Sequence, residues 1–598
     1  MNILAAGLVL GSVSFVECPK CDKRIRISED GTTAFVNTSR FDPGRRAEIS
    51  ARAENLLAQG SRVPVGGRLM PLMGWSSWNT FAVDISEEII VGVAQAMATN
   101  GLRDAGYRYV NIDDGFFNGH GSDGMLRFHP KRFPNGMKGT VDRIHALGMK
   151  AGIYSDAGSN TCGSSWNNDV SGIGAGLYGH DLSDCRLHFG EIGFDFFKVD
   201  YCGGQELKLD ERTRYTEIAT AIRATGRTDV RLNICRWAFP GTWAADVAGS
   251  WRTTKDIRAS WESVRDIIAE NLYLSAYASP GHFNDLDMLE VGQRKGAVAS
   301  AFGGEGDVGF TEDEEVTHFG MWCMLSSPLV LGCDVRNMRP ESLRLVTNPY
   351  LLAMSQNDLG LQGYVVVREG EAYVLAKDAD RRFGTSRYVA LYNANDSEHV
   401  FQVKASDLDL GGRIAAFDLV AKADIGEFAD VVTVKVPPHA SRFFRFDAER
   451  RLERSVYEAE TAFLTDYSEL DGTPYGSEKS CRAQGRPFPM QVPAASGGVA
   501  VANLGGRATN DLVWKEVRID RPGTRTLRFR CASSGARAFL VQVDGDRPVE
   551  LKSADTKGAF ADVTLDVALS EGTHVVRLFN PSAPMPDVDV MRVVGASE

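Results

Sequence analysis

The chain has 598 residues, which is too long for one hydrophobic core and predicts about three or four domains. Apolar residues make up 43% and charged residues 24%, as in ordinary soluble proteins, and the formal net charge is −12. Because the chain is acidic and shows no basic stripe, nucleic acid is not expected as a partner. No run of about 18 apolar residues occurs, so we expect no transmembrane helix.

The N-terminal segment, residues 1–65, opens on the apolar run "MNILAAGLVLGSVSF". The run has about the length of a signal-peptide core, but it lacks the Lys or Arg that normally precedes one. Two interpretations stay open, a signal-like start and a buried strand or helix. The Ala/Arg/Glu-rich stretch "GRRAEISARAENLLAQG" near the end of the segment predicts a helix.

From residue 66 to residue 350, short apolar runs alternate with longer amphipathic segments such as "SEEIIVGVAQAMATNGLRDAG". This alternation has the period of a (β/α)8 barrel, in which each of eight parallel strands is followed by a helix. The sequence therefore predicts an α/β barrel over 66–350. The expected strands lie in "LMGWSSW", "YRYVNIDDG", "KAGIYSDAG", "FDFFKVDYC", "VRLNICRW", "SWRTTKDI", "GHFNDLDM" and "SSPLVLGCDV".

Two all-β units are predicted after the barrel. Residues 351–450 contain alternating runs such as "EAYVLAK" and "RYVALYN" without long helices, which is typical of an antiparallel β-sandwich domain. Residues 455–598 alternate again in "RTLRFRCA" and "DVTLDVAL", and the turn spacing predicts a second, C-terminal β-sandwich.

Almost every expected barrel strand becomes polar or aromatic at its carboxyl end. In this fold the carboxyl ends surround one mouth of the barrel, where active sites lie. Capping of the following helices would explain one or two of the acids, but it explains the pair Asp113 and Asp114 poorly. We therefore expect one pocket lined by several strands. Its residues would be Trp78, Asp113, Asp114, Tyr154, Asp156, Asp200, Arg236, Asp256 and Asp287.

The stretch "GFDFFKVDYCGG" places three reactive groups on one face of a strand. Strand alternation puts Lys198, Asp200 and Cys202 on the face that points to the barrel axis. Lys198 would offset part of the cost of burying Asp200 and favour its ionised form, which a carboxylate nucleophile needs. A buried ion pair without chemistry is the alternative interpretation.

A second carboxylate favours a catalytic role for Asp200 over a purely structural ion pair. Asp256 ends the sixth expected strand and would face Asp200 across the pocket, and two facing carboxylates are the groups that cleave glycosidic bonds. One attacks the anomeric carbon, while the other protonates the leaving oxygen and then activates water. Hydrogen-bond acceptors and aromatic faces for a sugar ring would come from Asp113, Asp114, Trp75, Trp78 and Tyr154.

Five motifs resemble those of glycoside hydrolase family 27, the α-galactosidase or melibiase family. They are "MGWSSWNTF" (73–81), "NIDDGF" (111–116), "GIYSDAG" (152–158), "FKVDYC" (197–202) and "FNDLDMLEVG" (283–292). The resemblance covers about residues 70–445 and implies a retaining exo-hydrolase of terminal α-galactosyl residues. It implies Asp200 as nucleophile, Asp256 as acid/base, no cofactor for catalysis, and a Cys162–Cys202 disulfide at the pocket rim. The implied sugar contacts are Trp78, Asp113, Asp114, Tyr154, Lys198, Arg252 and Asp287.

One position departs from the family pattern. The family's galactosidases usually carry Glu in a fifth-strand "CEW" motif, where this chain has Arg236 in "CRW". Because that Glu helps to hold the sugar 2-hydroxyl, Arg236 joins the substrate-binding candidates and the sugar stays open. α-Galactosides are expected first. The alternatives are β-L-arabinopyranosides, α-N-acetylgalactosaminides or α-glucans, and a carbohydrate-binding protein without catalysis.

The last domain contains "YEAE" near its start and "MPDVDVMRV" near its end. In this it is similar to β-sandwich carbohydrate-binding modules that calcium stabilises, which implies Glu458, Glu460 and Asp589 as Ca²⁺ ligands. A sandwich without metal is the alternative. The carbohydrate chemistry and the implied disulfide predict a periplasmic or secreted protein that acts on a galactose-containing oligo- or polysaccharide, with no oligomeric state specified.

Overall fold

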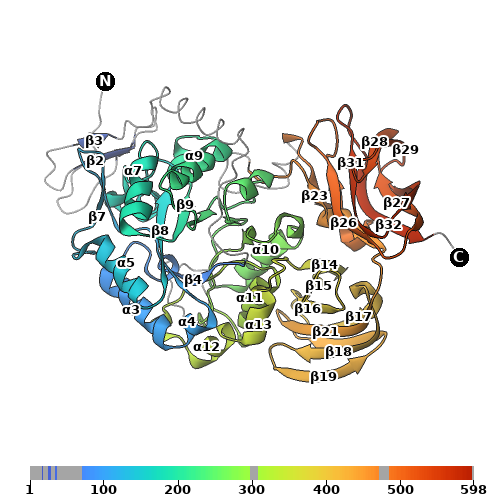
Figure 1. Cartoon of the computed structure of the whole chain (residues 1–598), viewed down its shortest axis with the longest axis horizontal. Coiled ribbons are helices and arrows are strands. Elements are labelled where there is room, and N and C mark those ends of the chain that lie inside the picture. The colour runs from blue at the N-terminus through green and yellow to red at the C-terminus, as the bar shows by residue number, and fades with distance from the viewer. Residues whose placement is uncertain are drawn as a thin grey trace.

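The computed structural model describes residues 16–17, 24–27, 34–36, 70–295, 308–470 and 484–595. Figure 1 shows an α/β unit, coloured blue to green, with two β-rich units in yellow and orange to red lying on one side of it. A small antiparallel sheet of β1 (Val16–Glu17), β2 (Arg24–Ile27) and β3 (Ala34–Val36) precedes the α/β unit. The helix expected within "GRRAEISARAENLLAQG" lies outside the described residues.

Eight parallel strands form one curled sheet in the order β12-β11-β10-β9-β8-β5-β4-β13. Its two edges meet just after β12, where Leu289 N–H donates to Val330 O at 2.7 Å and Gly332 N–H donates to Leu289 O at 2.9 Å. Each predicted run contains one strand, so the predicted (β/α)8 barrel is confirmed. The strands are β4 (Met73–Ser76), β5 (Tyr109–Ile112), β8 (Lys150–Asp156), β9 (Phe196–Asp200), β10 (Arg231–Ile234), β11 (Ser250–Arg252), β12 (Phe283–Asp285) and β13 (Leu329–Leu331).

Side-chain caps set where the larger barrel helices begin. Ser86, Asp210 and Ser260 each accept a hydrogen bond from the backbone N–H three residues further on, at the starts of α3, α9 and α10. Thr311 and Glu314 form a reciprocal capping box at the start of α11. The helices are α3 (Glu87–Thr99), α5 (Gly136–Ala146), α9 (Glu211–Arg223), α10 (Trp261–Asn271), α11 (Glu312–Met324), α12 (Pro340–Val346) and α13 (Pro349–Ser355).

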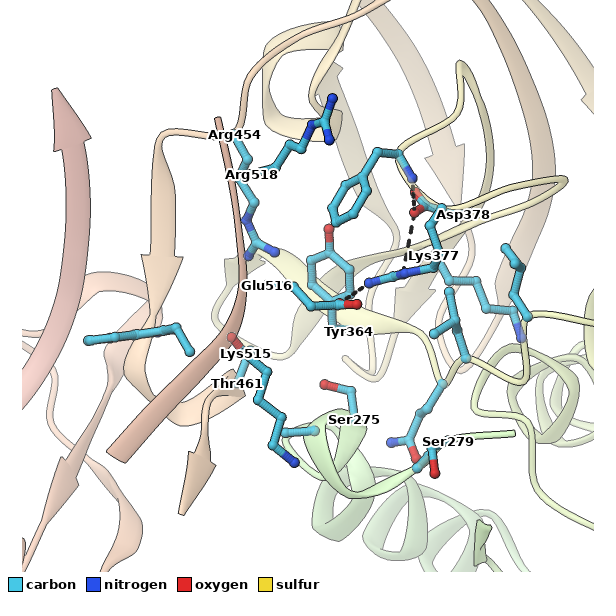
Figure 2. Close-up of a pocket in the computed structure, with 18 of the residues that line it drawn as sticks. Ser275, Ser279, Tyr364, Lys377, Asp378, Arg454, Thr461, Lys515, Glu516 and Arg518 are labelled. Atoms are coloured by element: carbon cyan, nitrogen blue, oxygen red, sulfur yellow. Dashed lines mark hydrogen bonds and ion pairs between the residues drawn. The ribbon is translucent and has the colours of Figure 1, made fainter. Parts of the chain in front are cut away.

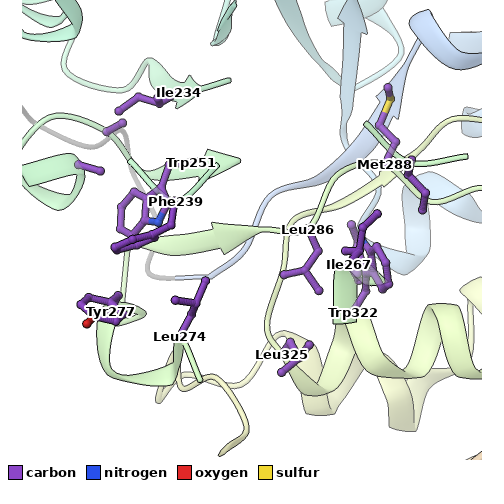
Figure 3. Close-up of a cluster of buried hydrophobic side chains, with 14 of the residues drawn as sticks. Ile234, Phe239, Trp251, Ile267, Leu274, Tyr277, Leu286, Met288, Trp322 and Leu325 are labelled. Carbon is purple, nitrogen blue, oxygen red and sulfur yellow. The ribbon is translucent and has the colours of Figure 1, made fainter. Parts of the chain in front are cut away.

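A continuous apolar core lies between the barrel strands and the helices, and Figure 3 shows the part around β11, β12 and α11. Two fully buried indoles tie these elements together. Trp251 Nε1 donates to Asn284 Oδ1, and Trp322 Nε1 donates to the backbone oxygen of Asp287, each at 2.8 Å. Buried Trp N–H groups need such partners, so these bonds fix the segment that carries Asp287 at the barrel mouth.

The middle β-domain is antiparallel, as predicted. Its main sheet has the order β14-β15-β16-β21-β18-β19, and β17 pairs with β20 in a second, two-stranded sheet. The inward-facing side chains of these two layers, such as Phe401 and Phe444, form a second apolar core. The strands are β14 (Tyr364–Glu369), β15 (Ala372–Asp378), β16 (Ser386–Asn393), β17 (His399–Lys404), β18 (Leu410–Asp418), β19 (Ala423–Phe428), β20 (Val431–Val436) and β21 (Ser441–Arg451).

The C-terminal unit is a β-sandwich, also as predicted. One sheet has the order β24-β25-β32-β27-β30 with β22 beside β32, and the other has the order β23-β26-β31-β28-β29. The strands are β22 (Val456–Glu458), β23 (Phe463–Leu464), β24 (Phe488–Gln491), β25 (Val499–Ala502), β26 (Leu512–Ile519), β27 (Gly523–Ala532), β28 (Arg537–Val543), β29 (Val549–Ser553), β30 (Phe560–Leu569), β31 (Gly572–Phe579) and β32 (Asp587–Gly595).

The sandwich packs against the barrel through aromatic rings. Tyr467 stacks on Phe239 with ring centroids 5.3 Å apart, and Tyr277 lies 5.2 Å from Phe463. Polar bonds flank this cluster: Glu469 N–H donates to Phe239 O at 2.9 Å, and Phe239 N–H donates to Glu469 Oε2 at 3.1 Å. Because Phe239 lies in the loop after β10, the sandwich holds a loop of the barrel mouth.

Across the described parts of the chain, none of the helices combines the length and the hydrophobicity that crossing a bilayer requires.

Candidate active site

The fourth barrel strand, β9, carries the central ion pair of the site. Lys198 Nζ lies 3.0 Å from Asp113 Oδ2 and 3.8 Å from Asp200 Oδ2, so the ammonium bridges the ends of β5 and β9. The Asp200 side chain is 7% exposed, and its Oδ1 has no hydrogen-bond partner among the described residues. An ionisable oxygen held in this way is available to a reacting atom.

The two acids that follow β5 are held in place differently. Asp113 Oδ2 accepts hydrogen bonds from Ser76 Oγ at 2.9 Å and from Lys198. Asp114 accepts two backbone bonds, from Gly115 N–H to Oδ1 at 2.7 Å and from Gly163 N–H to Oδ2 at 2.6 Å. These bonds fix the direction of both carboxylates before any ligand arrives.

A disulfide between Cys162 and Cys202 joins the loop after β8 to the loop after β9. This confirms the disulfide that the family resemblance implied. Cys162 N–H donates to the Tyr154 hydroxyl at 3.1 Å, and the next amide, of Gly163, holds Asp114. The cross-link therefore anchors the segment that positions Tyr154 and Asp114. A Cβ on Gly163 would lie 2.7 Å from Asp114 Oδ2, so the contact requires glycine here.

Asp256 lies on the other side of the mouth, beyond β11. Arg252 reaches both Asp256 Oδ1 at 3.0 Å and Asp287 Oδ2 at 2.9 Å. The Asp256 side chain is 47% exposed, in contrast to the deeply buried Asp200. Asp287 has a left-handed backbone, with φ of 78°, and also accepts a bond from Ile257 N–H. Non-glycine residues in this conformation often lie at functional sites.

Burial controls the pKa values at the mouth. Burial raises the pKa of Asp200 to about 6, although the Lys198 ammonium and the Cys235 thiol lower it, and the negative charges of Asp256 and Asp113 raise it further. Burial likewise raises the pKa of Asp114 to about 7 and that of Asp287 to about 6. Asp200 and Asp256 are therefore close enough to interact electrostatically, one deep in the pocket and one at its rim.

Comparison with known proteins agrees with this geometry. A family model described as alpha galactosidase A matches residues 70–357, and one described as the alpha galactosidase C-terminal beta sandwich domain matches residues 369–446. The chain is 34% identical over 392 residues to alpha-galactosidase A of Cellvibrio japonicus, which covers 62% of this chain and 90% of that protein. The chain belongs to glycoside hydrolase family 27.

Solved structures of family members share its barrel and middle domain. Alpha-galactosidase I from Mortierella vinacea is 29% identical with a TM-score of 0.57, covering 65% of this chain and 99% of that one. A family 27 β-L-arabinopyranosidase from Geobacillus stearothermophilus is 27% identical with a TM-score of 0.55, covering 64% and 97%. This family 27 chain is thus a retaining glycoside hydrolase, and its family uses one scaffold for more than one sugar.

Three predicted residues lie differently from the simplest expectation for a family 27 pocket. Trp75 is completely buried and donates its indole N–H to Cys333 O at 2.8 Å, so it offers no face to a sugar. Trp78 begins the short helix α2 (Trp78–Phe81) directly after β4 and is nearly buried. Arg236 is fully buried, with Nε bonded to Glu211 Oε1 at 3.2 Å.

The surroundings of Arg236 explain its orientation in this family 27 chain. Its guanidinium lies over the rings of Tyr201, at 5.3 Å, and Trp237, at 5.9 Å. Glu211 is the first residue of α9, so the Arg236 side chain is directed to a helix start and two aromatic rings. In this conformation it exposes no surface to a ligand.

The sequence analysis missed Cys235. Its thiol is buried, lowers the pKa of Asp200, and lies 3.6 Å from the Nη1 of Arg252. It therefore contacts the arginine that holds Asp256 and Asp287, and it influences the titration of Asp200. Its position at the end of the fifth run, where the other strands carry polar groups, was the signal for it.

Proposed function

We propose that this family 27 enzyme releases terminal α-galactosyl residues from oligo- or polysaccharides. The observation that carries the proposal is the combination of two carboxylates: Asp200, whose buried Oδ1 has no hydrogen-bond partner among the described residues, and Asp256, which lies at the rim and is held by Arg252. The family relatives named alpha-galactosidases support galactose as the sugar.

In the proposed mechanism, an oxygen of Asp200 attacks the anomeric carbon while Asp256 gives its proton to the leaving oxygen. The C–O bond to the leaving group breaks and a covalent galactosyl ester forms on Asp200. Asp256, now ionised, removes a proton from water. That water attacks the same carbon, releases galactose and regenerates both carboxyl groups with net retention.

The substrate contacts stay a proposal for residues around this pair. Asp113 and Asp114 would accept bonds from hydroxyls, and Tyr154 would offer its ring face to the sugar. Lys198, which lies beside Asp200, would also contact the sugar ring. The remaining proposed contacts are Trp78, Arg252 and Asp287. Arg236, being turned to Glu211, would shape the pocket wall and would reach a sugar only after leaving that partner.

A panel of nitrophenyl glycosides tests the sugar. We expect turnover of the α-galactoside to exceed that of the β-L-arabinopyranoside, the α-N-acetylgalactosaminide and the α-glucoside by at least tenfold in kcat/KM. A 2-deoxy-2-fluoro galactosyl donor should leave a covalent sugar on Asp200, detected by peptide mass spectrometry. Faster turnover of the arabinopyranoside would favour the second candidate, which the Geobacillus stearothermophilus relative supports. Binding without turnover of any glycoside would favour a non-catalytic protein.

We propose a calcium site in the C-terminal sandwich. Glu458 Oε2 and Glu460 Oε2 are buried without hydrogen-bond partners among the described residues, and buried carboxylate oxygens fit a hard cation. Asp589 is already bonded to Arg530 and Ser496, and within the described residues the three carboxylates do not all approach within 4.8 Å. Glu458 and Glu460 are thus the primary ligands. Calcium should raise the unfolding temperature, and Glu460→Gln should abolish the rise.

The proposed location is periplasmic or secreted. The disulfide between Cys162 and Cys202 supports it, because such bonds persist in oxidising compartments.

A further inference from the structure

A large cavity lies where the three units of the chain meet, away from the barrel mouth. Its volume is about 780 Å³, which suits a ligand of disaccharide size or larger. Figure 2 shows Ser275 and Ser279 on the barrel side of this junction pocket, with Lys515 and Arg454 on another side. Ser279 precedes the first residue of β12, so the pocket lies at the amino end of that strand, opposite to the carboxyl ends that carry the catalytic acids.

The junction pocket has more cations than carboxylates, although the whole chain carries a net charge of −12. Most of its acidic side chains already form ion pairs with arginines that also line the pocket. The pairs are Asp378 with Arg382 and Arg451, Glu516 with Arg382, and Asp520 with Arg518.

Three cations of the junction pocket, Arg454, Lys515 and Lys377, have no carboxylate partner among the described residues. No carboxylate of the described residues lies within 4.0 Å of the charged nitrogens of Arg454 or Lys515. Of the three, Lys377 is buried and bonds Cys323 O and Ser326 Oγ of the barrel. Arg454 and Lys515 are therefore the charges that a ligand can use.

Both cations are held in place without being neutralised. The Arg454 guanidinium lies between the rings of Tyr364, at 4.7 Å, and Tyr457, at 4.8 Å, and its Nε donates to Val456 O. The Lys515 ammonium lies 3.3 Å from the ring centre of Phe463. Aromatic faces attract cations but leave their N–H groups free to bond an anion.

Neutral hydrogen-bonding groups complete the lining. The side-chain hydroxyls of Ser275 and Ser279 make no hydrogen bond to any described residue, and both line the pocket. Hydroxyl groups next to fixed cations suit a ligand that carries hydroxyls and a negative charge together.

We propose that the junction pocket binds an acidic glycan, a sugar bearing a carboxylate or a sulfate, with Arg454 and Lys515 on the anionic group and Ser275 and Ser279 on ring hydroxyls. Such a site would hold the enzyme on an acidic polysaccharide while the active site at the barrel mouth removes neutral sugar units from it. The binding does not depend on which glycoside the barrel cleaves.

Calorimetry on the full chain tests the proposal with three probes, tri-galacturonic acid, a sulfated galacto-oligosaccharide and neutral galactotriose. We expect the acidic probes to bind at least tenfold more tightly than neutral galactotriose and to weaken as salt rises. The two acidic arms distinguish carboxylate from sulfate. Inorganic phosphate is a fourth probe, and phosphate binding without binding of the acidic sugars would overturn the proposal.

Substitution locates the site. Lys515 is at an exposed position of β26, so Lys515→Gln removes its ammonium with little risk to folding and should weaken acidic-probe binding about fivefold. Arg454→Gln/Lys515→Gln should weaken it at least 20-fold. Lys552→Gln, an exposed lysine of the same sandwich outside the pocket, is the matched control and should bind as the parent does. Nitrophenyl glycoside turnover should stay unchanged in all three. Unchanged acidic-probe affinity in Lys515→Gln and the double variant would overturn the proposal.

Discussion

At the scale of single residues, the two proposed catalytic acids differ in their exposure. Asp200 is buried beside Lys198, whereas Asp256 lies at the rim on Arg252. Burial favours the neutral carboxyl and Lys198 favours the carboxylate, and the outcome is a pKa of about 6 for Asp200. A nucleophile with this pKa is ionised at neutral pH and becomes protonated in mild acid.

The pH profile follows from that value. Because attack requires the carboxylate, kcat/KM should fall as the pH drops through about 6. Lys198→Met removes the charge that lowers the pKa of Asp200, so the acidic limb should move to higher pH in whatever activity remains. Lys150→Met, which removes a partly exposed lysine paired with Asp195, is the control and should leave the limb in place. An acidic limb near pH 4 in the parent would contradict this account.

The same burial predicts that Asp200→Asn stabilises the fold while it stops turnover. The pKa of Asp200 is raised from 3.8 to about 6 in the folded state. The folded protein therefore loses stability as the pH rises from about 4 to about 6, because the unfolded chain releases this proton more easily. Above pH 6 the cost is constant, roughly 3 kcal/mol at most. Asn carries no such cost, and Lys198 keeps Asp113 as its partner.

Denaturant unfolding of the parent and Asp200→Asn at pH 7.5 and pH 4 measures this cost. The variant should be more stable by about 1–3 kcal/mol at pH 7.5 and by much less at pH 4. A variant that is less stable at pH 7.5 would show that the buried carboxylate contributes favourable interactions that outweigh its desolvation.

At the scale of elements, one cross-link organises the loops after β8 and β9. The disulfide joins residues 40 positions apart, and the backbone amides of Cys162 and Gly163 hold Tyr154 and Asp114. The carboxylate of Asp156, which is fully buried, accepts bonds from Gly203 and Gly204 at the start of the helix that begins with Cys202. The proposed sugar contacts Tyr154 and Asp114 thus depend on backbone amides of a segment that the disulfide anchors.

Cys162→Ser/Cys202→Ser should lower stability by up to about 4 kcal/mol, from the chain entropy that the cross-link removes in the unfolded state. We also expect KM for the nitrophenyl galactoside to rise about fivefold or more, because Tyr154 and Asp114 lose fixed partners. Thermal unfolding and steady-state kinetics measure both. A thiol reductant should reproduce the change in the parent and have no further effect on the double variant. If the reductant left the unfolding temperature of the parent unchanged, the structural role of the disulfide would be contradicted.

At the scale of the whole molecule, the C-terminal sandwich is continuous with the barrel core. Tyr467 stacks on Phe239, lies 5.8 Å from Tyr277, and bonds Glu469, which in turn holds the Phe239 backbone. A domain attached in this way supports the loop that follows β10 and its Arg236, in addition to any carbohydrate binding of its own.

Tyr467→Ala should destabilise the chain by about 3 kcal/mol, as large-to-small substitutions of buried aromatic residues do. It should also lower kcat/KM several-fold, because the loop after β10 loses its support. Tyr350→Ala on α13 is the control: this ring is partly exposed and contacts Phe417 of the middle domain, so the variant should lose less stability than Tyr467→Ala and keep the parent kcat/KM. Loss of stability with unchanged kcat/KM would show that the interface holds the domains together without acting on the mouth.

The pattern of apolar and polar residues in the sequence predicted much of the fold of this protein. Periodicity identified all eight barrel strands and both β-rich units, because strand and helix periods are local properties of a sequence. Strand alternation placed Lys198 and Asp200 on one face, and motif resemblance implied the disulfide, which is present. The boundaries at 350 and 450, the roles of the site residues and the cellular location stay predictions.

Only the tertiary structure decided the partners of these groups. Lys198 lies closer to Asp113 than to Asp200, Arg236 bonds Glu211, and Cys235, directly after β10, lowers the pKa of Asp200. The junction pocket, likewise, has walls from three units far apart in the chain. A sequence determines the face on which a side chain lies because that follows from local backbone geometry. The partner it finds there depends on distances between segments that are remote in sequence, and those are fixed only when the chain has packed.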